Sequence, residues 1–345
     1  LAPFRDVAKR KLANRTWKQN VLELISWGGI HETERDANCI KAWFRAQYAE
    51  TIRDRKAGSA DMDWEIVGTA FHRWARDNSL RLAIGSEDQN SSLITNKLPF
   101  FTKAYCIILS ASQSYTSGLE SLFYNAHNDF TWQNTVLLAP LDIADDDIIV
   151  KKKMAAVATF LDIWLMRRAV NYIRVGYSSV SYAMWLLCKD IRRKKIEELV
   201  EILQENLASD DVTFGGSPSR GRNGLDELGL NQFSRRYIFH LLARVTAYTE
   251  AGAGRSTNFP LLIDRTTKNP FDIEHIWPND FTVYRSEFSS EQEFRDFRNH
   301  VASLLLLPAD VNRSLQAKIY DDKCPHYAKQ NFYAASLDSS VYVHQ

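Results

Sequence analysis

Two short apolar runs near the C-terminal end of the chain constrain its fold more than any other feature. The first is Asp272-Ile273-Glu274-His275-Ile276-Trp277-Pro278, and the second is Ser303-Leu304-Leu305-Leu306-Leu307-Pro308. Short apolar runs closed by proline are typical of buried strands, because proline cannot continue a ladder and disfavours helix at the preceding residue. The segment Val311-Asn312-Arg313-Ser314 then predicts an Asn-initiated helix. The order strand, strand, helix is therefore expected.

The first run carries a glutamate beside a histidine, and this pair suits phosphodiester hydrolysis. Attack on phosphorus needs a water activated by a base of near-neutral pKa, and His275 is a base of that kind. A hard cation such as Mg²⁺ stabilises the charge of the transition state through oxygen ligands, for which Glu274 and Asn312 are candidates. Neighbouring side chains of a regular strand point to opposite faces, so Glu274 and His275 reach one phosphate only if the strand ends there.

The order of these elements resembles that of the HNH endonucleases, which have the ββα-metal fold. More narrowly, residues 271–337 resemble the C-terminal nuclease domain of GmrSD-type modification-dependent restriction enzymes and of the SspE proteins of phage defence. The resemblance rests on Ile273-Glu274-His275-Ile276-Trp277-Pro278, Ala302-Ser303-Leu304-Leu305-Leu306-Leu307, Asn312-Arg313-Ser314, Tyr320, Lys323 and Tyr327. It implies that His275 is the general base, that Glu274 and Asn312 hold Mg²⁺ or Mn²⁺, and that DNA is the substrate.

One departure from the family pattern concerns the residue that orients the histidine. Where the family has Gly-Asn, this chain has Ala302-Ser303. The candidates for the orienting role are Asn299, Ser303 and His300, and a backbone carbonyl that accepts the second ring N–H is an alternative. The motif itself also has structural interpretations. Glu274 and His275 could be a polar pair at the surface, and Asn312 could serve only as a helix cap.

The remainder of the chain is predicted to be mainly helical. Apolar residues recur every three to four positions, as in Ile196, Leu199, Val200 and Leu203. The segment 208–229 interrupts this pattern with Gly and Ser, and the segment 251–254 reads as a hinge. We therefore expect a mainly α protein with a helical platform over residues 1–253 and a small ββα-metal (HNH) domain over residues 254–345.

Charge is unevenly distributed along the chain. Residues 151–260 hold 17 Lys and Arg against 11 Asp and Glu, whereas residues 271–345 hold 7 against 11. Because a DNA-binding protein needs positive charge facing the phosphates, the basic region is a candidate DNA-binding face. The predicted DNA-binding residues are Arg192, Arg193, Lys194, Lys195, Arg313, Lys318 and Lys323. A solvated helix face, or for Lys323 a solvated surface position, is the alternative interpretation.

Composition sets the cellular context. Four cysteines are scattered without metal-ligand spacing, which favours reduced thiols in the cytoplasm and argues against a zinc-containing HNH subtype. No apolar run approaches the length of a membrane span, and no signal peptide is evident. The sequence also contains no P-loop. Because the chain begins at Leu1, we expect it to be a fragment or a processed form of a longer protein. Its expected partners are an N-terminal sensing or NTPase domain, or other proteins of a defence system, outside this chain.

Together these features predict a metal-dependent DNA endonuclease of a bacterial phage-defence or modification-dependent restriction system. A single site of this kind cuts one strand, so nicking is the expected outcome. The alternative is a non-catalytic helical module that binds DNA or docks a protein and carries a decayed HNH fold, which the Ala302-Ser303 departure favours.

Overall fold

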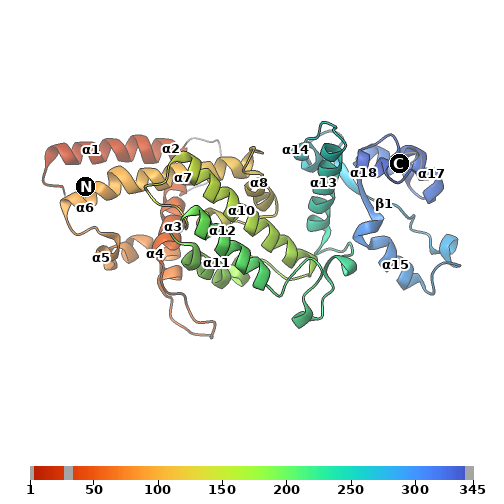
Figure 1. Ribbon diagram of the computed structural model, residues 1–345, viewed down its shortest axis with the longest axis horizontal. Coiled ribbons are helices and arrows are strands. Elements are labelled where there is room, and N and C mark those ends of the chain that lie inside the picture. The colour runs from red at the N-terminus through yellow and green to blue at the C-terminus, as the bar shows by residue number, and fades with distance from the viewer. Residues whose placement is uncertain (1–3, 27–33, 339–345) are drawn as a thin grey trace. The chain divides into compact units, whose positions relative to one another are not determined.

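The computed structural model describes residues 4–26 and 34–338, and these residues are mainly helical with a two-stranded sheet. The chain forms two compact units, coloured from red through green and from green to blue in Figure 1. The first unit comprises Leu1–Leu165 and Val175–Asp210, and the second comprises Met166–Arg174 and Asp211–Gln345. No helix in the described part of the chain is long and apolar enough to cross a membrane.

The division between the units differs from the predicted boundary at residue 253. The helix α13 (Arg235–Gly252) belongs with the C-terminal unit, because it packs against the strand β2 (Leu304–Pro308) and the helix α18 (Phe332–Ala335). The predicted hinge lies partly inside α13, which continues to Gly252. The spacing of apolar residues predicted helices throughout this part of the chain, but it did not show on which element each helix packs.

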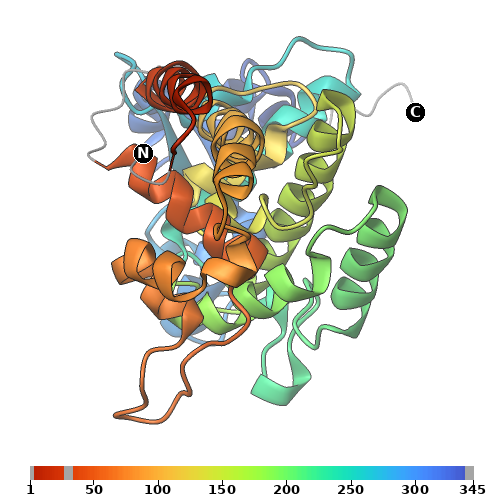
Figure 2. The ribbon, with the colours of Figure 1, turned by 90° about the vertical axis from the view of Figure 1, so that its left-hand side faces the viewer.

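The first unit is a bundle of helices, which Figure 2 views from its end. Its helices are α1 (Val7–Trp17), α2 (Glu23–Ser26), α3 (Arg35–Tyr48), α4 (Asp63–Asp77), α5 (Ser79–Leu82), α6 (Glu87–Ser92), α7 (Leu98–Gln113), α8 (Glu120–His127), α9 (Gln133–Val136), α10 (Asp147–Val170, which continues into the second unit), α11 (Tyr177–Ile191) and α12 (Ile196–Ser209). π-helical turns lie at Lys18–Leu22 and Leu93–Lys97.

The core of the first unit is rich in aromatic rings, which remove large apolar areas from water. Trp43 on α3 is 1% exposed, and its ring stacks on Phe101 of α7 at a centroid distance of 4.9 Å. The predicted apolar side of α12 is confirmed at Leu199 and Leu203, which are buried. The four residues before Ile196 are not helical, so the basic run 192–195 is a connection rather than a helix face.

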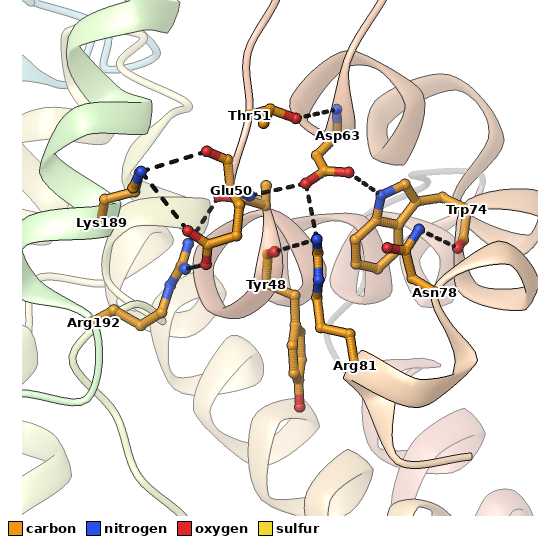
Figure 3. A network of polar contacts seen from close by, with 10 residues as sticks. Tyr48, Glu50, Thr51, Asp63, Trp74, Asn78, Arg81, Lys189 and Arg192 are labelled. Carbon is orange, nitrogen blue, oxygen red and sulfur yellow. Dashed lines mark hydrogen bonds and ion pairs between the residues drawn. The ribbon is translucent and has the colours of Figure 1, made fainter. Parts of the chain in front are cut away.

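A polar network holds the end of α3 to the start of α4 (Figure 3). Asp63 accepts hydrogen bonds from Trp74 Nε1 at 2.7 Å, from Arg81 Nη1 at 2.8 Å and from the backbone N–H of Glu50 at 3.0 Å. Burial acts to raise the pKa of Asp63, but these donors lower it below its usual value because they favour the carboxylate. The ends of the loop 49–62 are thereby fixed.

The second unit is built around the antiparallel pair of β1 (Phe271–His275) and β2, with His275 opposite Leu304 and Glu274 opposite Leu305. The strand β1 ends at His275, as predicted. Leu304–Leu307 are all buried, because both faces of the sheet are covered. The other helices of this unit are α14 (Phe259–Ile263), α15 (Glu291–Asn299), α16 (Ala309–Leu315) and α17 (Tyr320–Tyr327), and 3-10 turns lie at Pro218–Arg220, Gly224–Glu227, Phe281–Tyr284 and Val301–Ser303.

The helix α16 begins at Ala309, three positions before the predicted start. Pro308 ends β2, and the side chain of Asn269 binds both the backbone N–H and the carboxylate of Asp310, which fixes the first turn. Asn312 therefore lies inside the helix and is not its N-cap. Its side chain is free of the capping role that sequence alone left open.

Candidate active site

Glu274 lies at the centre of a buried polar cluster on β1. Its Oε1 atom accepts hydrogen bonds from Lys323 Nζ at 2.7 Å and from Tyr327 Oη at 3.0 Å, and Lys323 also donates to the carbonyl of His275 at 2.8 Å. Both partners lie on α17, and Lys323 is only 1% exposed. Burial and the adjacent carboxylate raise the pKa of Tyr327, so its hydroxyl remains a donor. The cluster fixes the carboxylate of Glu274 in one orientation.

His275 is held by a different element. Its Nε2 atom lies 3.0 Å from Oδ1 of Asn299, the last residue of α15. Because an amide oxygen only accepts, Nε2 carries the proton and Nδ1 is left with a lone pair. Burial lowers the pKa of His275 to about 4, and the positive charges of Arg298 and Lys323 act in the same direction. His275 is thus neutral at pH 7, which is the form a general base requires.

Asn312 lies on α16 beside β1. Its Nδ2 atom donates to the carbonyl of Ile273 at 3.1 Å. This hydrogen bond fixes the amide and leaves Oδ1 as an acceptor. The side chain therefore has one end anchored on the strand and one end available to a ligand.

Glu274 and Asn312 carry side-chain oxygens, the type of ligand that a hard divalent cation prefers. Mg²⁺ commonly uses one or two protein oxygens together with waters and substrate phosphates. Glu274 is bound through Oε1 and, among the described residues, receives no hydrogen bond at Oε2. Anchoring one atom of a ligand side chain while the other faces the cation is the usual arrangement at metal sites. Among the described residues, no group of three or more His, Cys, Asp or Glu side chains is placed to hold a metal ion by itself.

Two of the three candidate orienting residues lie elsewhere. His300 Nε2 contacts the carbonyl of Asp226 at 3.2 Å, and its Nδ1 accepts from the backbone N–H of Ala302. Ser303 is buried, and its carbonyl accepts from the N–H of Ile276 at 3.0 Å. Both residues support the ends of the strands, and Asn299 is the one that contacts His275.

The predicted DNA-binding residues of this unit have different environments. Arg313 is exposed, and Lys318 Nζ lies 3.1 Å from Nε2 of His326. Lys323 does not lie on a surface that DNA could contact, because it is buried against Glu274. Lysine is rarely buried unless it is paired, and the carboxylate that pairs with it was not identifiable from sequence spacing.

The basic run 192–195 of the first unit is largely engaged within that unit. Arg192 forms an ion pair with Glu50 (Figure 3). It also donates to the carbonyls of Ala46 and Ala49 at 2.9 and 3.0 Å. Arg193, although exposed, donates to Gln47 Oε1 at 2.8 Å, and Lys194 pairs with Glu198. Lys195 is exposed. Arg192 therefore joins the end of α11 to α3 and does not face solvent as predicted for a DNA contact.

Sequence reasoning missed Arg298 as a member of this site. Its Nε atom donates to the carbonyl of Trp277 at 2.9 Å, just beyond the strand end, and its charge acts on both Glu274 and His275. Burial lowers the pKa of Arg298 itself, and the Glu274 carboxylate opposes that shift. The sequence signal that could have identified Arg298 is its position directly before Asn299, because the last turn of α15 places both residues at the end of β1.

Comparison with known proteins identifies one domain. Residues 222–337 match the family model for GmrSD restriction endonucleases, C-terminal domain. No curated protein and no solved structure matches the chain. The matched segment contains β1, β2 and α13–α18, and with them every residue of the site described above. This part of the chain is therefore similar to the C-terminal region of a GmrSD-type restriction endonuclease.

Proposed function

We propose that the second unit is a ββα-metal (HNH-type) nuclease that hydrolyses DNA phosphodiesters with His275 as its general base, in a cytoplasmic defence or restriction system. The observation that supports this most strongly is the contact between His275 Nε2 and Asn299 Oδ1. This contact sets the tautomer in which Nδ1 is the basic atom. The match of residues 222–337 to a restriction endonuclease domain supports DNA as the substrate.

In this reaction Nδ1 of His275 takes a proton from a water as its oxygen attacks phosphorus. Asn299 keeps the ring fixed throughout, because the hydrogen bond at Nε2 does not change. The low pKa of His275 in the free protein is a consequence of burial and of nearby positive charges. A bound phosphodiester brings negative charge next to the ring, which raises the pKa toward neutrality and strengthens the base.

Glu274 and Asn312 would hold Mg²⁺ or Mn²⁺ through the oxygens that their anchoring hydrogen bonds leave unused. When bound, the cation would supply positive charge to the phosphoryl group and to the leaving 3′ oxygen. Lys323 and Tyr327 orient the Glu274 carboxylate and do not touch the substrate. Hydrolysis at one such site leaves a 5′ phosphate and a nick.

A plasmid cleavage assay tests this function. Supercoiled DNA incubated with the protein and Mg²⁺ is expected to become nicked, and chelation of the metal is expected to stop the reaction. His275→Ala should slow nicking by about 10²-fold or more, whereas His72→Ala, which changes an exposed histidine of the first unit, should not slow it. Intact plasmid with the unaltered protein and either metal would support the alternative of a non-catalytic module, and nicking by His275→Ala at the rate of the unaltered protein would remove the histidine from the mechanism.

A further inference from the structure

A pocket of about 450 Å³ opens on the first unit, a volume in the range of ligand-binding pockets. It lies between the loop 49–62, the start of α4 and the start of α11. The loop projects from the helices in both views of the chain (Figures 1 and 2). Aromatic rings form one part of the lining and arginines form another, and the pocket shares no residue with the proposed nuclease site.

The aromatic part is a continuous stack of three rings. Trp64 stacks on Trp132 at a centroid distance of 5.2 Å, and Trp132 stacks on Tyr177 at 4.2 Å with an interplanar angle of 12°. Both indole N–H groups are bonded, to Ser181 Oγ and to the carbonyl of Tyr177. The two tryptophans are buried, whereas Tyr177 is 53% exposed. The stack therefore ends in a rigid ring that is covered on one face and open toward solvent.

The arginines place positive charge beside this ring. Arg45 lies over both tryptophans at 5.3 Å and donates to Tyr177 Oη at 2.9 Å. Gly68 makes room for it, since a Cβ atom there would lie 2.0 Å from Arg45 Nη2. Arg55 lies over the ring of Tyr182 at 4.4 Å, and among the described residues no carboxylate pairs with it.

The lining holds three arginines and two carboxylates, Asp54 and Glu65, and so carries one net positive charge. Arg53 pairs with Asp61 at 3.1 Å, and Glu65 is occupied by the backbone N–H groups of Arg53 and Met62. Asp54 is the one other carboxylate of the lining. The helix α11 begins at the pocket without a side-chain cap, so the positive end of its dipole is directed there.

We propose that this pocket binds a nucleoside phosphate, with the base stacked on Tyr177 and the phosphate held by Arg55 and the start of α11. An open aromatic face recognises any base, because every base has a π face. Guanidinium groups and a helix N-terminus recognise phosphate. The ligand is either a free nucleotide or one nucleotide of a single DNA strand. This binding function is separate from phosphodiester hydrolysis and does not depend on it.

Titration of the whole chain, followed by the fluorescence of its tryptophans, tests the proposal. The probes are adenosine and thymidine monophosphates, the corresponding nucleosides, inorganic phosphate, and a short single-stranded oligonucleotide. The mononucleotides are expected to bind more tightly than either the nucleosides or phosphate. If the free nucleotide is the ligand, mononucleotide and oligonucleotide bind equally well. If a DNA strand is the ligand, the oligonucleotide binds more tightly and the mononucleotide competes with it.

Substitutions in the pocket separate the two parts of the recognition. Tyr177→Leu should weaken binding roughly tenfold or more, the loss expected for one stacked base, and Tyr177→Phe should retain it. Arg55→Ala should reduce the affinity for nucleotide toward that for the nucleoside, and Arg55→Lys should restore part of the difference. Tyr115→Leu and Arg73→Ala, at exposed positions of the same unit outside the lining, are the matched controls.

Binding that is the same in Tyr177→Leu and Tyr115→Leu would overturn the proposal. The proposal would also be overturned if the pocket bound a tyrosine-phosphorylated peptide and none of the nucleotide probes. The variant His275→Ala should bind nucleotide as the unaltered protein does. Nucleotide binding and DNA cleavage are thus measured independently, so failure of one proposal can be distinguished from failure of the other.

Discussion

At the scale of single residues, the same chemical type serves different purposes in this chain. Lys323 is buried and neutralises Glu274, whereas Lys195 is exposed in the first unit. Arg298 acts on the charges of the proposed active site, whereas Arg192 joins helices far from it in sequence. The neighbours that determine these roles lie tens of positions away. Sequence spacing therefore did not reveal Arg298 and did not distinguish buried, paired cations from cations available to DNA.

The pairing of Lys323 with Glu274 should contribute strongly to the stability of the second unit. Lys323→Met removes the ammonium and leaves a buried carboxylate uncompensated, which should lower the free energy of unfolding by about 3–5 kcal/mol. Lys329→Met, at an exposed position two residues beyond Tyr327, should change it by less than about 0.5 kcal/mol. Denaturant unfolding measures both variants. Equal stability of the two would show that the ion pair is not formed in solution.

The carboxylate of Asp63 should make the stability of the first unit dependent on acid. Its pKa lies below the value of 3.8 expected in the unfolded chain, so its stabilising effect is present above that pH. The effect is lost as pH falls through the lower, folded-state pKa. Asp63→Asn should therefore be less stable than the unaltered protein at neutral pH, and the difference should narrow in acid. The melting temperatures of the two proteins, measured from neutral pH into strong acid, test this expectation. A difference in melting temperature that stays constant over this range would contradict it.

At the scale of elements, the sequence predicted the two strands because their apolar runs are closed by Pro278 and Pro308. The pairing register, in which Glu274 lies opposite Leu305, does not follow from burial alone, because the four consecutive leucines of β2 are buried on both faces of the sheet. The start of α16 was not predictable from local signals. Asn269, which lies 41 positions before Asp310, fixes the first turn, and that contact exists only in the folded chain. Asn312 is thereby a candidate ligand and not a cap.

The orienting partner of His275 illustrates the same limit. The departure at Ala302-Ser303 left three side chains and a backbone carbonyl as candidates in the sequence. Which of them reaches the ring depends on where α15 ends relative to β1. The helix ends at Asn299, and its side chain contacts Nε2. The chemistry could be predicted from residue types, whereas the choice among neighbours required the three-dimensional path of the chain.

At the scale of the whole molecule, the second unit extends well before the predicted hinge. The backbone of Leu228 accepts from Val301, and Leu230 donates to Asn299 at 2.7 Å. Ile238 of α13 is fully buried. The platform of the first unit is therefore shorter than sequence reasoning suggested, because periodicity marks a helix without showing which core it joins. The matched domain, which begins at residue 222, agrees with this division.

This division predicts the behaviour of two fragments. Residues 254–345 alone lack α13 and should fail to unfold cooperatively, because one side of β2 is left uncovered. Residues 211–345 lack only the Met166–Arg174 segment of the second unit, retain α13 and the contacts of Leu228 and Leu230, and should unfold cooperatively. Circular dichroism during thermal unfolding measures both. A cooperative transition of similar midpoint in the shorter fragment would instead place the domain boundary at residue 253.

The single-turnover rate of DNA cleavage in His275→Ala, Asn299→Ala and the double variant most directly tests His275 as a base positioned by Asn299. His275→Ala should reduce the rate by about 10²-fold or more, as for loss of a general base, with DNA binding unchanged. Asn299→Ala should cause a smaller loss, and the double variant should be no slower than His275→Ala, because Asn299 acts through the histidine. A rate in His275→Ala equal to that of the unaltered protein, or losses that multiply in the double variant, would contradict the assignment.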